Sequence, residues 1–383
     1  MCVIRLKIVP FFSDASIGDG AAKQLHQIKL RMMQAQLSVI RLKKQLVKAR
    51  AKIQNLEEQL KKLKDRDYDM RFTADMVNAS GVNGLFRYYC GFEFCEFENL
   101  CQFLLVSEDT KQPAPLHLRN KSLSISLRDQ LFLVLMRLRN NFDMKDLGYR
   151  FHISQPNVSI ICSDWINYLF RRFAEISWWP QKSVLQSVMP EKYKEDFPNT
   201  IAIIDCTEIK IQTPSSLKVQ SQCYSDYKSA STLKSLVACD SLGSVMFASK
   251  LFTGSISDKE IFVQSGFSKT LSALLECGYL EAGDGIMADK GFNIAEEVEK
   301  LGLKLNLPPF ARSGMQMSLQ DVEFTKKIAK HRVHVERAIG KIKKFKILSA
   351  IIKNKTLGSI DQIWYVCSML TNFQPPLLPI PYV

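Results

Sequence analysis

The sequence lacks the segments that mark several specialised classes of protein. None of its apolar runs approaches the roughly 18 residues that a membrane-spanning helix needs. No internal repeat and no low-complexity tract is visible along its 383 residues. The sequence therefore predicts no contact with a membrane, and its 46% apolar content predicts a buried core.

Cysteine is present but lacks the spacing of a metal site. None of the ten cysteines forms a C-x-x-C pair, and the cluster of Cys90, Cys95 and Cys101 has neither a fourth cysteine nor a histidine nearby. Structural zinc is therefore disfavoured, and buried free thiols are expected. Free thiols are typical of a reducing compartment, the cytosol or the nucleus.

Acidic residues are scarce where the basic residues concentrate. The chain carries 52 Lys and Arg against 38 Asp and Glu, a formal charge of +14. Between Lys23 and Arg66, 13 basic residues stand against three acids, so this segment alone accounts for +10. An excess of this size indicates a polyanionic partner such as nucleic acid.

The same basic segment, residues 23–66, has the apolar spacing of a coiled coil. Its apolar residues recur at alternating intervals of three and four over six repeats. This seam consists of Leu25, Ile28, Met32, Ala35, Val39, Leu42, Leu46, Ala49, Ile53, Leu56, Leu60 and Leu63. A lone surface helix rarely keeps this period so long, so we expect a coiled coil of about 60 Å. A homodimer is the default and a trimer the alternative.

The segments around the coil are assigned by composition. Residues 1–22 are expected to be unstructured, and residues 70–120 form an aromatic, Gly-punctuated connector whose chemistry stays open. The basic face of the coil is explained either by solvation or by contact with phosphates.

A helix-turn-helix is expected within residues 121–176. Leu147 and Phe151 face inward on a first helix, and Ser154 caps a second helix that has a proline in its first turn. The polar side chains near the start of the second helix would face a DNA groove, where they can contact base edges. These side chains are Gln155, Asn157 and Ser159. Ordinary packing of two helices explains the same pattern equally well.

Residues 198–375 alternate between strand and helix signals, which predicts a sheet flanked by helices. The predicted strands cover residues 201–204, 233–239, 245–252, 286–288 and 303–307. A long helix comes last, opened by a capping box at Ser318 and Asp321 and running to about Phe345. The fold class is therefore α/β, preceded by an all-α region and the coil.

Two aspartates follow short buried runs in this region. Asp205 comes after Ile-Ala-Ile-Ile, and Asp289 comes after Ile-Met-Ala, with Gly291 allowing a sharp turn behind it. Both carboxylates are expected to emerge at the C-terminal edge of a strand, where ligands of open α/β sheets gather. A buried ion pair or a turn cap would explain either aspartate alone.

Glu336 lies on the long helix, one residue from its apolar stripe, among basic residues. His334 and Arg337 flank it, and Lys341, Lys343 and Lys344 continue a basic track that we expect to contact DNA. A salt bridge back to Arg332, four residues earlier, is the simple alternative for Glu336. We expect His334 and Arg337 to contact phosphate or Glu336, because Mg²⁺ prefers oxygen ligands.

Together the three carboxylates have the layout of a divalent-metal nuclease site. A phosphodiester gains negative charge as it is attacked, and enzymes hold it between two cations about 4 Å apart. Asp205, Asp289 and Glu336 come from three separate elements and carry the hard oxygen ligands that two Mg²⁺ or Mn²⁺ ions prefer.

Five phrases of the sequence resemble the DDE superfamily endonuclease domain of PIF/Harbinger-type transposases, in order and in spacing. The resemblance covers about residues 120–375. The phrases are Tyr224-Ser-Asp-Tyr-Lys-Ser, Gly254-Ser-Ile-Ser-Asp-Lys-Glu-Ile, Met287-Ala-Asp-Lys-Gly-Phe, Leu307-Pro-Pro-Phe and His334-Val-Glu-Arg-Ala-Ile-Gly-Lys-Ile-Lys.

The resemblance implies an RNase H-like fold in which Asp205, Asp289 and Glu336 form the metal-binding triad. Asp258 is the main rival for the second carboxylate and is placed nearby, outside the triad, as is Glu208. The expected activity is that of a nuclear, transposon-derived endonuclease that cuts and joins DNA. The alternative is a domesticated transposase that only binds DNA or protein through its helix-turn-helix and coil.

Overall fold

The computed structural model describes residues 19–69, 72–105, 125–309 and 317–378. The chain divides into two units, residues 1–71 and residues 72–383, each compact by itself. Of the predicted unstructured segment, residues 1–18 lie outside the described residues. Of the predicted connector, residues 106–120 lie outside them as well. None of the described helices is both long enough and apolar enough to cross a membrane.

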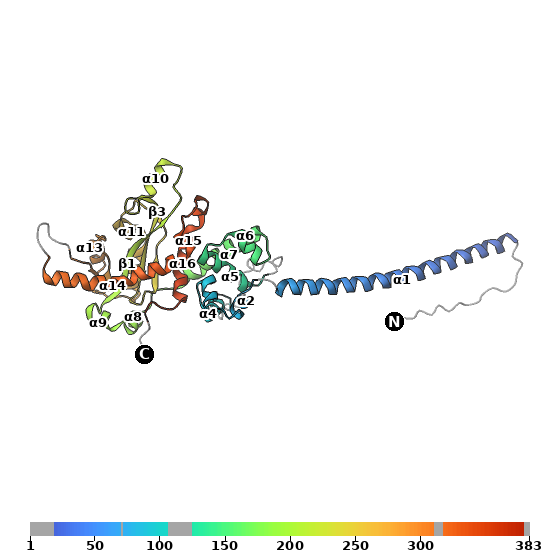
Figure 1. Ribbon diagram of the computed structural model, residues 1–383, viewed down its shortest axis with the longest axis horizontal. Coiled ribbons are helices and arrows are strands. Elements are labelled where there is room, and N and C mark those ends of the chain that lie inside the picture. The colour runs from blue at the N-terminus through green and yellow to red at the C-terminus, as the bar shows by residue number, and fades with distance from the viewer. Residues whose placement is uncertain (1–18, 70–71, 106–124, 310–316, 379–383) are drawn as a thin grey trace. The chain divides into compact units, whose positions relative to one another are not determined.

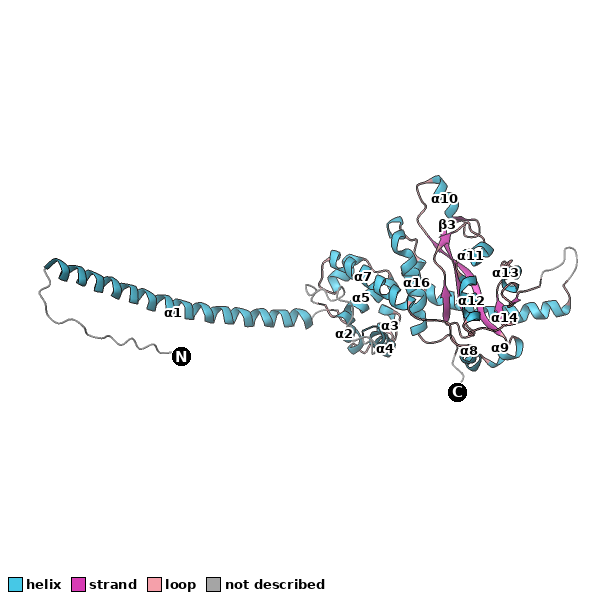
Figure 2. Ribbon diagram, turned by 180° about the vertical axis from the view of Figure 1, so that it is seen from behind, coloured by secondary structure: helices cyan, strands magenta, loops and turns pink. Residues whose placement is uncertain are grey.

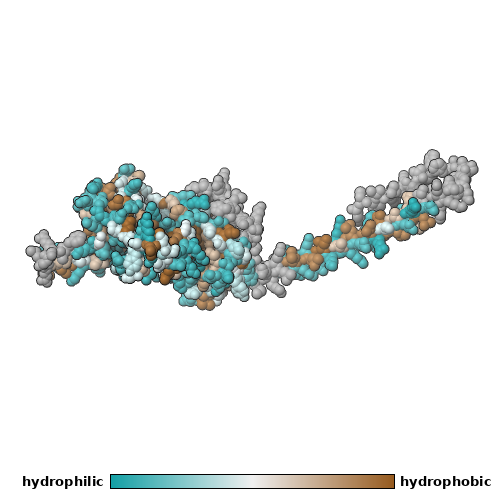
Figure 3. Space-filling model, turned by 90° about the horizontal axis from the view of Figure 1, so that it is seen from above, coloured by the Kyte–Doolittle hydropathy of each residue, from teal (hydrophilic) through white to brown (hydrophobic). Residues whose placement is uncertain are grey.

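The described part of the first unit is one uninterrupted helix, α1 (Asp19–Asp69), 51 residues long. Its side chains are described at residue 27 and over residues 30–62, and all of these are exposed. Seam residues such as Leu42 and Leu46 are 62% and 52% exposed, and apolar side chains run along the helix in Figure 3. The long helix is confirmed, while its pairing stays a prediction.

The second unit begins with helices that include the predicted helix-turn-helix. The helices are α2 (Ala74–Ala79), α3 (Leu85–Cys90), α4 (Phe94–Leu105), α5 (Leu127–Asn140), α6 (Met144–Arg150) and α7 (Gln155–Ala174). Leu147 and Phe151 are buried, as predicted. The Ser154 hydroxyl accepts a hydrogen bond from the Asn157 N–H at 3.4 Å, so Ser154 caps α7.

Gly148 sits where the turn of the helix-turn-helix passes close to α6. A Cβ at this position would lie 2.7 Å from the carbonyl oxygen of Ile153. We expect Gly148→Ala to destabilise the second unit by about 1–3 kcal/mol, because backbone must shift to admit the methyl group. Gly340→Ala is the matched control, since a Cβ there meets open space within a helix. Urea unfolding should show the control unchanged or stabilised, and equal effects of the two substitutions would contradict the steric explanation.

A seven-stranded mixed sheet forms the centre of the second unit, with a main order β2-β3-β1-β6-β7. The strands are β1 (Thr200–Lys210), β2 (Tyr224–Ser225), β3 (Ala230–Cys239), β4 (Val245–Ala248), β5 (Phe252–Thr253), β6 (Gly285–Met287) and β7 (Lys304–Asn306). β1 pairs antiparallel with β3 and parallel with β6, and β7 continues the parallel part. The predicted single strand over residues 245–252 is instead two strands, β4 and β5.

Helices cover both faces of this sheet, as expected for the predicted fold. The helix α14 (Leu319–Lys343) lies on one face, where its Ile328, Val335 and Ile342 join a core with Ile203 of β1. On the other face, α11 (Asp258–Gln264), α12 (Phe267–Glu276) and α13 (Ala295–Glu299) pack against Ile204 and its neighbours. Figures 1 and 2 show these two layers from opposite sides.

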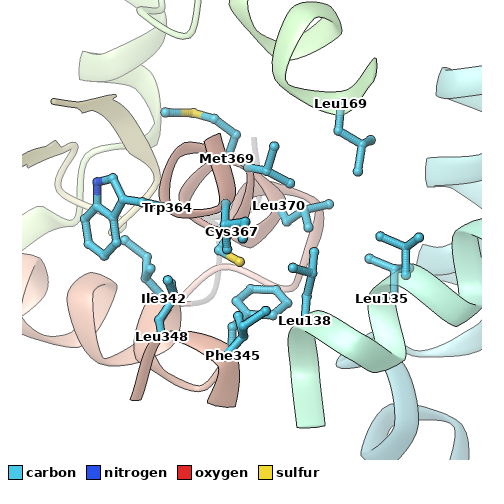
Figure 4. Packing of buried hydrophobic residues seen from close by; sticks show 14 of the residues in the cluster. Leu135, Leu138, Leu169, Ile342, Phe345, Leu348, Trp364, Cys367, Met369 and Leu370 are labelled. Carbon is cyan, nitrogen blue, oxygen red and sulfur yellow. The ribbon is translucent and has the colours of Figure 1, made fainter. Parts of the chain in front are cut away.

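The helix-turn-helix and the sheet share one hydrophobic core. Leu135 and Leu138 of α5 and Leu169 of α7 belong to the same cluster as the residues of α14, α15 (Lys346–Ser349) and α16 (Ile360–Leu370). Figure 4 shows these side chains around Cys367 and Leu370 of α16. The remaining helices, α8 (Lys182–Val188), α9 (Glu191–Asp196) and α10 (Leu217–Cys223), lie in the connections around the sheet.

Candidate active site

Asp205 on β1 and Asp289 just after the end of β6 occupy matching positions relative to the pairing of these two parallel strands. Ile203 of β1 is paired with Met287 of β6, and each aspartate lies two residues further along its strand direction. Because side chains alternate across a strand, Asp205 is on the same face as Ile203, and this is the face that α14 covers. The register of the sheet therefore brings the two aspartates together.

One expectation about Asp205 was wrong. The buried run before it suggested a strand end, yet β1 continues to Lys210, and Asp205 lies opposite Val237 of β3. What ends beside Asp205 is the neighbouring strand β6, which stops at Met287. Asp205 thus lies two residues beyond the last residue of β1 that pairs with β6.

Glu336 reaches this region from α14. Its neighbour Val335 is fully buried against the sheet, whereas the Glu336 side chain is 58% exposed at the margin of the helix. The helix begins at the predicted Ser318 cap, where the Ser318 hydroxyl accepts from the Asp321 N–H at 3.1 Å. The expected helix is confirmed, although it ends at Lys343 rather than near Phe345.

Arg332 links the carboxylates. Its Nη1 donates a hydrogen bond to Oδ1 of Asp289 at 2.8 Å, and its Nη2 lies 3.8 Å from Oε1 of Glu336. The positive charge of Arg332 also acts on Asp205. Its Nε is buried without a hydrogen-bond partner among the described residues. One guanidinium thus contacts Asp289 and Glu336, and its charge acts on Asp205; the predicted salt bridge to Glu336 is long.

Asp205 has a perturbed carboxyl group. Burial raises its pKa to about 6, and the negative charges of Asp289 and Asp258 act in the same direction. The charge of Arg332 and a 2.9 Å hydrogen bond from the Cys206 N–H oppose this rise. Any added positive charge near such a carboxyl group stabilises its ionised form and lowers its pKa.

The pKa of Asp205 predicts a specific pH dependence of stability. Between its ordinary pKa of 3.8 and about 6, the folded chain binds more protons than the unfolded chain. Stability contributed by the protonated group is therefore present below about pH 4 and lost as the pH rises through 6. In EDTA, Asp205→Asn should be close to wild type in unfolding free energy near pH 4 and more stable at pH 7. If the difference in unfolding free energy between Asp205→Asn and wild type is the same at pH 4 and pH 7, the raised pKa of Asp205 is contradicted.

The donor set suits a hard divalent cation, but its present arrangement does not form a ligand cluster. Among the described residues, no three His, Cys, Asp or Glu side chains gather closely enough to hold one ion. Carboxylate oxygens are nevertheless the ligands that Mg²⁺ prefers. The cation now in contact with two of these carboxylates, Asp289 and Glu336, is the Arg332 guanidinium.

Asp258 and Glu208 lie on the other face of β1. Asp258 pairs with Lys234 at 2.6 Å and, after burial, is the main cause of the raised pKa of Cys206. Glu208 accepts a hydrogen bond from the Thr232 hydroxyl at 2.8 Å. Side chains alternate along β1, so Cys206 and Glu208 point to the face opposite Asp205. Asp258 lies on their side of the sheet and influences the pKa of Asp205 through its charge. This geometry favours Asp289 over Asp258 as the second carboxylate.

His334 does not have the exposed position that a phosphate contact requires. It is buried, and its ring centroid lies 6.5 Å from that of Tyr193. Burial lowers its pKa to about 4, aided by the charges of Arg337 and His331, so the ring is neutral at pH 7. His334 and Glu336 are two residues apart on α14 and therefore point in different directions. His334 lies toward Tyr193 of α9, while Glu336 faces outward. Arg337 is exposed and remains available for phosphate.

The three lysines of the predicted basic track have different surroundings. Lys341 was wrongly assigned to DNA, because its Nζ donates to the carbonyls of Thr371 and Pro375, both at 2.8 Å. Burial lowers its pKa to about 8, and its role is to hold the chain after α16. Lys343 is half-buried, and burial lowers its pKa; the charge of Lys228 adds to this fall, and those of Glu208 and Asp205 oppose it. Lys344 is exposed.

The polar residues at the start of α7 are accessible to different degrees. Gln155 is exposed, and Asn157 and Ser159 are half-buried. They lie in the first turn and a half of a capped helix, which is where a recognition helix presents its base-contacting side chains. Their contact with DNA stays a prediction.

Gly254 is a structural residue whose role the sequence alone did not reveal. A Cβ there would lie 2.2 Å from the Thr232 hydroxyl and 2.6 Å from the carbonyl oxygen of Cys223. The available signal was its place at the start of the Gly-Ser-Ile-Ser-Asp phrase. The glycine allows the chain between β5 and α11 to pass close to β3, which positions Asp258 beside Lys234.

Comparison with known proteins agrees with this geometry. The family of DDE superfamily endonucleases matches residues 204–372, which contain all three carboxylates, and the helix-turn-helix of DDE superfamily endonuclease matches residues 123–175. HARBI1 of Xenopus laevis, named as a candidate nuclease, is 25% identical over 175 residues. That match covers 45% of this chain and 48% of HARBI1, so the chain spans about half the length of this curated relative. The chain therefore carries a Harbinger-type DDE superfamily endonuclease domain, preceded by the helix-turn-helix domain of the same superfamily.

Proposed function

We propose that this protein is a divalent-metal-dependent DNA endonuclease of transposon origin, with Asp205, Asp289 and Glu336 as its catalytic triad. The observation that carries the proposal is the Arg332 guanidinium, which lies 2.8 Å from Asp289 and 3.8 Å from Glu336 and whose charge lowers the pKa of Asp205. An acidic set around one cation, inside a domain of this family, is suited to two Mg²⁺ or Mn²⁺ ions. When bound, such ions would activate water or a DNA 3′-hydroxyl and stabilise the leaving oxygen.

The residues of the chain itself have distinct tasks in this proposal. Asp205 must be ionised, and added positive charge lowers its raised pKa toward the ordinary range. Asp289 and Glu336, which now contact Arg332, would hold the ions together with Asp205. Lys343 and Arg337 lie on the same helix and would hold phosphates of the substrate, while Asp258 stays paired with Lys234. Joining of DNA ends follows if a 3′-hydroxyl replaces water.

The test is the nicking of supercoiled plasmid by the purified full chain. We expect open-circular product with Mg²⁺ or Mn²⁺ and none in EDTA. Equal nicking in EDTA would refute a metal-dependent site. Plasmid binding that persists in EDTA, with no nicking under any divalent ion, would instead favour a domesticated protein that only binds DNA through α6 and α7.

We further propose that the chain acts in the nucleus and as a homodimer paired through the α1 seam. The exposed seam side chains, such as Leu42, Leu46 and Leu56, support the pairing because apolar residues at this period need a helical partner. A dimer would hold two DNA ends at once. The free cysteines among the described residues are compatible with a reducing compartment.

A further inference from the structure

The helix α1 carries a second apolar stripe that the seam does not include. Large apolar side chains recur at intervals of three and four, and all of them are exposed, by 44% to 66%. This outer stripe consists of Leu30, Met33, Leu37, Ile40 and Val47, with Lys44 as its only polar member. Such a period is typical of a surface that packs against another helix.

The outer stripe lies far from the seam around the helix. With Leu25 at heptad position a, the seam occupies positions a and d, and the outer stripe occupies positions b and f. At about 100° per residue, the centres of the two stripes are about 150° apart. A partner helix in the seam therefore leaves the outer stripe uncovered. Beyond Val47 the same positions carry the small Ala51 and then Gln54, Glu58 and Lys61, so the run of large apolar side chains ends after about 27 Å.

Charge determines which partner suits this surface. The stripe is bordered by Arg41 and Lys48 on one side and by Lys43 and Arg50 on the other. No Asp or Glu occurs between residues 30 and 50. A second copy of α1 packed on this stripe would place these cations against the same cations of the other copy. Their electrostatic repulsion would grow as the contact excludes water. An acidic partner would meet complementary charge on both borders.

The shape of the stripe favours a protein helix over a lipid surface. Helices that lie in a membrane interface have a broad apolar face with Trp, Phe or Leu. The sequence of α1 contains no Trp and no Phe, and the outer stripe is only two heptad positions wide. A stripe this narrow matches the contact line between two packed helices.

We infer that the outer stripe of α1 binds an acidic amphipathic helix of a partner protein. Apolar side chains of that helix would pack between Leu30 and Val47, and its carboxylates would face the basic borders. This surface does not depend on the proposed nuclease activity.

The experiment measures binding of a labelled 21-residue peptide to the full chain by fluorescence anisotropy. The peptide has Leu at every third and fourth position and Glu elsewhere, and its matched control has Lys in place of Glu. We expect the acidic peptide to bind, with affinity falling as salt is raised, and the Lys peptide not to bind. The double substitution Leu37→Gln with Ile40→Gln should weaken binding by about tenfold or more, and so should Arg41→Glu with Lys48→Glu.

Light scattering on the same variants separates this surface from self-association. Unchanged mass of the Leu37→Gln, Ile40→Gln chain supports the inference, because the seam is intact. Three results would overturn it: equal peptide affinity in wild type and both variants, a lower mass of the stripe variant, or capture of the wild type by phosphatidylserine vesicles without binding of the acidic peptide.

Discussion

Replacing any one of Asp205, Asp289 and Glu336 by its amide is expected to reduce plasmid nicking by about a thousandfold or more. Each amide keeps the size of the side chain and removes one negative charge from the set around Arg332. Metal-ion catalysis supplies several kcal/mol of transition-state stabilisation, and about 1.4 kcal/mol corresponds to a factor of ten in rate. The measurement is the initial rate of open-circle formation with Mn²⁺ and with Mg²⁺.

Glu323→Gln is the matched control for Glu336→Gln. Both glutamates are exposed on α14, but Glu323 lies more than three turns away and has no part in the arrangement around Arg332. This variant should nick at the wild-type rate. Binding of DNA in EDTA should survive all four substitutions, since the predicted DNA-contacting residues are unchanged. Wild-type nicking by all three triad variants would show that the site assignment is wrong.

Asp258→Asn discriminates between the two candidates for the second carboxylate. Asp258 is already paired with Lys234 and lies on the opposite face of β1 from Asp205. We expect a smaller loss of nicking than for Asp289→Asn, accompanied by lower thermal stability because Lys234 loses its partner. A larger loss for Asp258→Asn would exchange the roles of these two aspartates.

Breaking the α1 seam is expected to convert the protein from a dimer to a monomer. Leu42→Glu with Leu46→Glu places two charges at adjacent d and a positions, where a paired helix would bury them. The free-energy cost of burying two unpaired charges exceeds the stabilisation from the apolar contacts that remain in the seam. Light scattering should show the mass fall from twice 43.7 kDa to 43.7 kDa.

Leu37→Glu with Val47→Glu is the matched control for the seam. These residues are similarly apolar and exposed, by 59% and 66%, but they belong to the outer stripe. The same change in charge should leave the dimer intact. A monomeric wild type, or dissociation of the control, would contradict pairing through the seam.

Local features of the chain were predicted well because they depend on neighbouring residues. Ser154 and Ser318 cap the helices that their sequence context predicted, since a cap needs only the N–H groups of the next turn. The long helix α1 follows from its period alone. The end of β1 was predicted less accurately. This strand continues past Asp205 because it pairs with β3, and the sequence does not display that pairing.

The roles of the basic residues could not be read from their order. Lys341 and Lys343 are two residues apart and looked equivalent, yet Lys341 donates hydrogen bonds to the carbonyls after α16, whereas the structure shows no such contact for Lys343 among the described residues. His334 and Glu336 are likewise two residues apart and point in different directions. On a helix, two residues of separation mean a rotation of about 200°, and only packing decides which direction is the interior.

The sequence by itself determined the capped helices and the long helix α1, and it singled out the three carboxylates as candidates, because residue type and spacing suffice for these. The tertiary structure decided how the carboxylates are related. The parallel register of β1 and β6 brings Asp205 beside Asp289, and α14 brings Glu336 and Arg332 over them. These residues are distant along the chain, and their approach depends on the burial of Ile203, Met287 and Val335 in one core.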